Sequence, residues 1–145
     1  MKHVLSEFLA GLRDVSAILV GVAPFGMIYG TLALGAGLPV TEAQAMSSVV
    51  FAGSAQFMMV QLFASATPPL VIVMVAFVVN LRHALYSASI APHLKYLSPV
   101  WRAGLAYLLT DEAYAVTITR FENKQGTGWQ HWYFLGAGLG LWPTW

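Results

Sequence analysis

The sequence predicts an all-α, polytopic integral membrane protein with about four to five transmembrane helices, some of them broken by proline or glycine. Of its 145 residues, 58% are hydrophobic and only 9% are charged, and the mean hydropathy is +0.68. A soluble domain carries about 25% charged residues to solvate its surface. Asp, Glu, Lys and Arg are absent from residues 15–41, 43–81 and 125–145. Uncharged apolar runs of about 18 residues or more are typical of membrane-spanning helices.

The composition also excludes several classes of function. The formal net charge is +1 and the basic residues form no run, so nothing indicates nucleic-acid binding. The chain has no cysteine, which excludes disulfides, thiolate metal sites and cysteine catalysis. Its four histidines are scattered, and no phosphate loop or hydrolase motif occurs. We therefore expect no enzyme activity, no metal and no cofactor.

The first predicted span covers residues 15–34. Its Pro24 lacks an amide hydrogen and clashes with the preceding turn, which predicts a kink or break within residues 21–26. Apolar residues in the preceding segment, 1–14, recur at helical spacing. This segment is either an amphipathic helix lying at the membrane surface or the solvated end of the first span.

The second predicted span covers residues 43–64 and is interrupted by small and polar side chains. Gly53, Ser54 and Gln56 stand in the middle of an otherwise apolar helix. Unwound backbone survives in a membrane only where it is buried or lines a cavity, and transporters use such breaks to hold zwitterions. A polar stripe of Ser47, Ser54 and Gln61 is more typical of contacts between helices.

The third predicted span begins near Leu70 and runs into polar residues. On a helix, Asn80, His83 and Ser87 share one face, and Arg82 lies on a second face. A charged side chain at the bilayer centre costs about 2.5–3.5 kcal/mol on insertion scales, so it needs a partner, a cavity or a function. The alternative is that Arg82 snorkels to the membrane surface and marks the end of the span.

The fourth predicted span covers residues 100–118 and contains Asp111 and Glu112. A carboxylate there either carries a proton or pairs with a cation such as Arg82, or else the pair ends a shorter helix at the membrane surface. The last segment, 129–145, is barely long enough to cross ~30 Å of hydrocarbon. Its Gly136 and Gly140 form a GxxxG pair, as do Gly26 and Gly30 in the first predicted span, and such pairs indicate close helix packing. We expect the chain to be truncated after Trp145.

Four motifs follow one another along the chain: Gly21-Val-Ala-Pro24-Phe25-Gly26 with Gly30, Phe51-Ala-Gly-Ser54-Ala-Gln56-Phe57, Asn80-Leu-Arg82-His83-Ala-Leu-Tyr86-Ser87, and Thr110-Asp111-Glu112. Taken together and in this order, they resemble the AzlC-like family of branched-chain amino acid permeases. The resemblance implies one membrane domain over residues 1–145, the N-terminal part of a multi-pass protein of the bacterial inner (cell) membrane. It also implies transport of valine, leucine or isoleucine, in the direction of export, with a small AzlD-like membrane protein as partner and the lipid bilayer as surroundings.

The polar residues within these motifs are the expected substrate site. We expect broken helices and amides to hold the zwitterion, Arg82 or His83 to compensate its carboxylate, and Asp111 or Glu112 to meet the ammonium or a coupling proton. The alternative is a non-transporting subunit or inactive fragment in which polar residues only mediate helix packing. The expected substrate-binding residues are Pro24, Gly26, Gly53, Ser54, Gln56, Asn80, Arg82 and His83.

Overall fold

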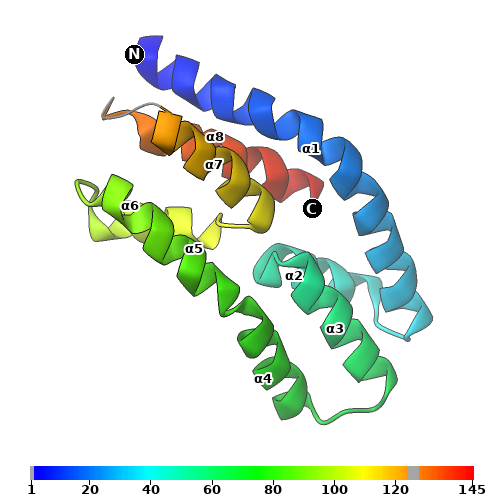
Figure 1. The fold of residues 1–145 in the computed structure, drawn as a ribbon. Coiled ribbons are helices and arrows are strands. Elements are labelled where there is room, and N and C mark those ends of the chain that lie inside the picture. The colour runs from blue at the N-terminus through cyan, green and yellow to red at the C-terminus, as the bar shows by residue number, and fades with distance from the viewer. Residues whose placement is uncertain (1, 124–127) are drawn as a thin grey trace. The chain divides into compact units, whose positions relative to one another are not determined.

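The computed structural model describes residues 2–123 and 128–145, and every regular element among them is helical (Figure 1). This confirms the all-α prediction. The helices are α1 (Lys2–Gly35), α2 (Val40–Val50), α3 (Gly53–Ala64), α4 (Pro69–Asn80), α5 (Arg82–Ile90), α6 (Pro99–Tyr107), α7 (Asp111–Asn123) and α8 (Gln130–Leu141), with short 3₁₀ turns at Ala91–Leu94 and Trp142–Thr144.

The chain forms two compact units, and α1 runs from one into the other. Unit 1 contains Met1–Val20 and His83–Thr144, and unit 2 contains Gly21–Arg82 together with Trp145. Two helical segments, Lys2–Gly35 and Pro69–Leu94, are long and apolar enough to cross a membrane. Along α4, Leu70, Val73 and Phe77 are exposed, as suits a lipid-facing surface. A total of four to five spans stays a prediction.

The helix remains continuous at Pro24, so of the predicted kink or break the break is wrong. Proline removes one backbone hydrogen bond, and the neighbouring residues still hold helical geometry. Residues 2–14 belong to the same helix as the first predicted span, which agrees with the second of the two interpretations of this segment.

The other predicted spans are divided into shorter helices. The second predicted span is interrupted between α2 and α3, as expected. The third continues past Asn80 after a single non-helical residue, Leu81. The fourth is wrong as a single helix, because residues 108–110 separate α6 from α7. Asp111 and Glu112 therefore occupy the first turn of α7, where carboxylates interact favourably with unpaired backbone N–H groups.

Glycines in unit 1 bring α1 and α8 into backbone contact. A Cβ atom on Gly11 would overlap the carbonyl group of Tyr133, and one on Gly136 would overlap that of Phe8. A Cβ on Gly140 would lie 2.8 Å from Cγ1 of Val15. Only glycine permits so close an approach, and the packing predicted from the GxxxG pair in α8 is confirmed. The same prediction is wrong for Gly26 and Gly30, because nothing described lies within 4 Å of the position that a Cβ would take at either residue.

A charged network joins the same helices of unit 1. Arg120 of α7 donates from Nη2 to both carboxylate oxygens of Glu7, each at 3.1 Å. Its guanidinium carbon lies 5.1 Å from the ring centroid of Tyr133, whose hydroxyl donates to Oδ2 of Asp14 at 2.8 Å. The network therefore connects α1 with both α7 and α8.

We expect Arg120→Gln to lower the free energy of unfolding of the detergent-solubilised chain by about 2 kcal/mol. The reason is that the substitution removes the cation from the Glu7 carboxylate, whose side chain is only 13% exposed. Thermal unfolding followed by circular dichroism measures the change. Arg102→Gln is the control, because Arg102 is exposed on α6 and its loss should change stability by less than about 0.5 kcal/mol. Equal stability of the two variants would contradict the prediction.

Unit 2 has a small apolar core that holds α1, α2 and α3 together. Its buried residues are Tyr29, Ala33, Leu38, Ala43 and Val60. The hydroxyl of Tyr29 donates to the carbonyl oxygen of Ala43 at 2.9 Å, so the polar end of this side chain is also satisfied. A second cluster of Ala52, Ala55 and Ala76 packs α3 against α4.

Candidate functional site

The interruption between α2 and α3 is the first feature of the candidate site, which lies wholly within unit 2. Phe51 adopts the left-handed conformation (φ 46°, ψ 42°), and Ala52 is extended (φ −150°, ψ 100°). A left-handed backbone at a residue with a bulky side chain is costly, and such strain is often found at functional sites. The N-cap residue of α3, Ala52, makes no side-chain capping hydrogen bond, and the first-turn N–H groups are the positive end of the helix dipole.

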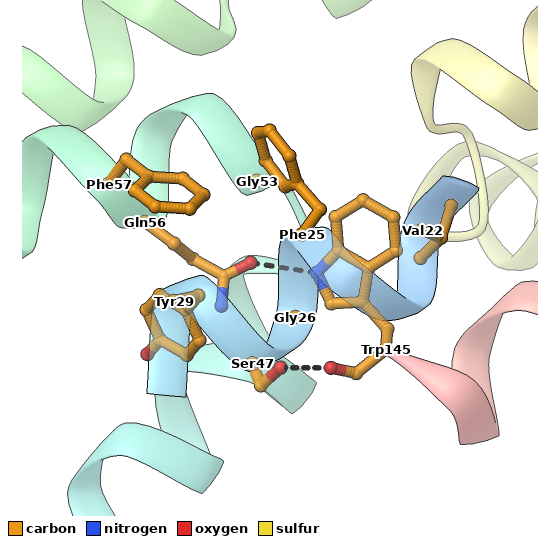
Figure 2. A pocket seen from close by; sticks show the side chains of 9 residues that line it. All are labelled: Val22, Phe25, Gly26, Tyr29, Ser47, Gly53, Gln56, Phe57 and Trp145. Atoms are coloured by element: carbon orange, nitrogen blue, oxygen red, sulfur yellow. Dashed lines mark hydrogen bonds between the residues drawn. The ribbon is translucent and has the colours of Figure 1, made fainter. Parts of the chain in front are cut away.

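A pocket in unit 2 lies at this interruption (Figure 2). Its apolar wall is largely aromatic, with the rings of Phe25 and Phe57 packed edge to face at 4.6 Å between centroids. Its lining residues are Val22, Phe25, Gly26, Tyr29, Ser47, Gly53, Gln56, Phe57 and Trp145.

Trp145 forms part of the wall of this pocket. Its indole Nε1–H donates to Oε1 of Gln56 at 2.8 Å, and the hydroxyl of Ser47 donates to its backbone carbonyl oxygen at 2.7 Å (Figure 2). The ring also packs edge to face against Phe51, with centroids 5.4 Å apart. The remaining cavity of about 20 Å³ has room for about one water molecule.

Arg82 adds a positive charge next to the start of α3. Its Nη2 donates to the hydroxyl of Ser54, in the first turn of α3, at 2.6 Å. The Arg82 side chain is half-buried. Arg82 and Ser54 both belong to unit 2, so this hydrogen bond lies within that unit. A guanidinium and a helix N-terminus both attract an anion. Here Ser54 belongs to the first turn of α3 and also accepts the hydrogen bond from Arg82.

The remaining predicted site residues fall in three places. Pro24 is exposed and does not line the pocket, and Asn80 is the half-buried last residue of α4. His83 belongs to unit 1, where its ring packs edge to face against Tyr86 at 5.8 Å. Asp111 and Glu112 also belong to unit 1. The structure therefore gathers Gly26, Gly53 and Gln56 at one pocket and pairs Ser54 with Arg82.

Sequence reasoning missed three polar contributors to the pocket. Ser47 was recognised only as part of a polar stripe with Ser54 and Gln61, and neither of those two residues lines the pocket. The hydroxyl-bearing Tyr29 and the ring of Trp145 gave no such signal, because aromatic residues are common throughout the chain.

The carboxylate of Glu112, in unit 1, has a buried oxygen atom. Oε2 of Glu112 is buried and, among the residues that the structure describes, has no hydrogen-bond partner. The side chain as a whole is half-buried. A buried oxygen of this kind can bind a proton or a small cation.

Comparison with known proteins gives one family. The family described as "AzlC protein" matches residues 17–145. A relative from Archaeoglobus fulgidus, named an uncharacterized membrane protein, is 32% identical over 99% of this chain and 61% of its own length. The inner membrane protein YgaZ of Escherichia coli is 22% identical over 97% of the chain and 57% of its own. An uncharacterized membrane protein of Helicobacter pylori is 30% identical over 90% and 58%.

The chain thus spans about three-fifths of the length of the curated relatives it matches. No solved structure matches it. The family match extends over most of the chain, and the relatives carry names of membrane proteins, in agreement with the apolar segments described above. The chain belongs to the AzlC family of membrane proteins.

Proposed function

We propose that this chain takes part in transporting branched-chain amino acids, and that unit 2 holds the substrate. The observation that carries this proposal is the hydrogen bond from Arg82 to Ser54 at the start of α3. It places a positive charge at Ser54, the residue after Gly53, and Gly53 lines a pocket with an aromatic wall. A charged group next to an apolar pocket matches an amino acid with an aliphatic side chain.

Each part of the substrate has a matching group. The carboxylate binds the Arg82 guanidinium and the first-turn N–H groups of α3, replacing the contact with Ser54. The aliphatic side chain enters the pocket between Phe25 and Phe57, and the ammonium donates to Oε1 of Gln56. These positions require Trp145 to leave, because its ring lines the pocket and its N–H already donates to Oε1 of Gln56.

The remaining elements of the proposal rest on the family resemblance and on the names of relatives. We infer export through a bacterial inner membrane, with a small AzlD-like membrane protein as partner. The Escherichia coli relative is itself named an inner membrane protein. Glu112 is our candidate for the coupling proton, because one of its oxygens is buried and the structure gives it no partner within the described residues.

A second candidate function is a non-transporting subunit or an inactive fragment. The specific observation in its favour is that the polar groups of the pocket are already bonded within the chain. Arg82 bonds Ser54, and Trp145 bonds both Ser47 and Gln56. In that case these side chains hold helices together and meet no substrate.

Binding of radiolabelled leucine to the purified chain in liposomes tests the proposal. We expect Arg82→Gln to weaken leucine binding at least tenfold, because one charge-assisted hydrogen bond contributes about 1.5–3 kcal/mol. Ser54→Ala should have a smaller effect, since it removes only the hydroxyl that holds Arg82. Arg102→Gln, at an exposed position of unit 1, should bind like the unmodified chain. Unchanged leucine affinity in Arg82→Gln would refute the charge assignment.

A further inference from the structure

Trp145 occupies the unit 2 pocket in the manner of a bound ligand. Two polar side chains meet it, and both are almost completely buried. Gln56 is 2% exposed and accepts the indole N–H, whereas Ser47 is 4% exposed and donates to the backbone carbonyl oxygen. The ring nitrogen and the carbonyl group of one tryptophan residue therefore each have a hydrogen bond to a buried side chain.

The shape of the pocket also fits an indole ring. The edge-to-face contact with Phe51 fixes the plane of the ring. A Cβ atom on Gly53 would lie 3.2 Å from Cζ2 of Trp145, closer than ordinary van der Waals contact. Glycine at this position therefore leaves the space that the six-membered part of the indole fills (Figure 2).

The contacts of Trp145 are separate from the two apolar clusters described above for unit 2. Neither buried apolar cluster of that unit includes Trp145, which is itself only half-buried. The residues immediately before it, Trp142–Thr144, belong to unit 1. The contacts of Trp145 with unit 2 include two hydrogen bonds and the ring contact with Phe51, and a free ligand with the same groups can make them.

We propose that this pocket is a binding site for a free aromatic amino acid of the tryptophan class, and that Trp145 occupies it as a competing intramolecular ligand. Free tryptophan carries both recognised groups, an indole N–H and a carboxylate oxygen in place of the carbonyl. The proposal rests on the proposed function in one respect, that the pocket takes amino acids, and it extends the substrate class beyond branched aliphatic side chains.

Equilibrium dialysis of detergent-solubilised protein against L-tryptophan tests the proposal. We expect Trp145→Ala to bind L-tryptophan at least tenfold more tightly than the unmodified chain, because the competing ring is gone. Trp142→Ala is the matched control: Trp142 is 43% exposed and belongs to unit 1, so its loss should not change the affinity. Adding Gln56→Leu to Trp145→Ala should abolish the gain in affinity for L-tryptophan. A benzofuran analogue of tryptophan lacks the ring N–H, and Trp145→Ala should bind it at least tenfold more weakly than L-tryptophan.

A measurement on the unmodified sequence covers the case in which Trp145→Ala fails to fold. The chain has five tryptophans, so labelling with 5-fluorotryptophan gives five ¹⁹F signals, and Trp145→Phe identifies the one at the pocket. Excess free indole should shift that signal and leave the other four unchanged. No gain of tryptophan binding in a folded Trp145→Ala, or no selective shift, overturns the proposal. Binding of tryptophan without leucine would support it while refuting branched-chain specificity.

Discussion

Replacing Gly136 by alanine is expected to lower the stability of unit 1 by about 3 kcal/mol or more, because the added methyl group has no space. It would overlap the backbone carbonyl of Phe8, and backbone moves far less readily than the end of a flexible side chain. Relief requires α1 and α8 to separate, which also disturbs the approach of Gly11 to Tyr133. Thermal unfolding in detergent, followed by circular dichroism, measures the loss.

Gly104→Ala is the matched control for this prediction. Gly104 lies within α6 of the same unit, and nothing stands within 4 Å of the position its Cβ would take. Alanine is a better helix former than glycine by about 1 kcal/mol, so this variant should be as stable as the unmodified chain or slightly more so. Similar stability of Gly136→Ala and Gly104→Ala would show that the close approach of α1 to α8 is absent.

The second large effect is expected for Gly53→Val. A Cβ at this position already lies 3.0 Å from Cε1 of Phe25, and the branched side chain of valine would extend further into the pocket. We therefore expect binding of radiolabelled leucine in liposomes to fall at least tenfold. The ring of Phe25 can rotate away from the valine side chain only if its edge-to-face contact with Phe57 is lost.

Gly26→Ala provides the comparison, because Gly26 lines the same pocket but has open space around its Cβ position. Leucine binding should change less than threefold in that variant. Circular dichroism of both variants verifies that helix content is preserved. Full leucine binding by a folded Gly53→Val would mean that the substrate binds elsewhere.

Several features could be predicted because they depend on local sequence. The all-α architecture follows from long apolar runs, and the interruption of the second predicted span follows from small and polar residues beside Gly53. The packing role of Gly136 follows from its spacing with Gly140. By contrast, Pro24 predicted a break that does not form, because a single missing backbone hydrogen bond does not end a helix whose other bonds remain.

The site itself could be predicted only in part. The roles of Ser54 and Arg82 were expected separately, but their hydrogen bond joins residues 28 positions apart and depends on how α3 and α4 pack. Likewise, the predicted fourth span did not foresee that Asp111 and Glu112 begin a new helix, since no proline or glycine marks residues 108–110.

By itself the sequence determined that this is a helical membrane protein of the AzlC family, because apolar runs and short motifs are local properties of the chain. Only the tertiary structure decided which polar groups meet. Ser47 and Gln56 converge on Trp145, 98 and 89 positions away, through bonds that no spacing rule anticipates. The physical reason is that buried donors and acceptors need partners, and which partner each one finds depends on the packing of whole helices.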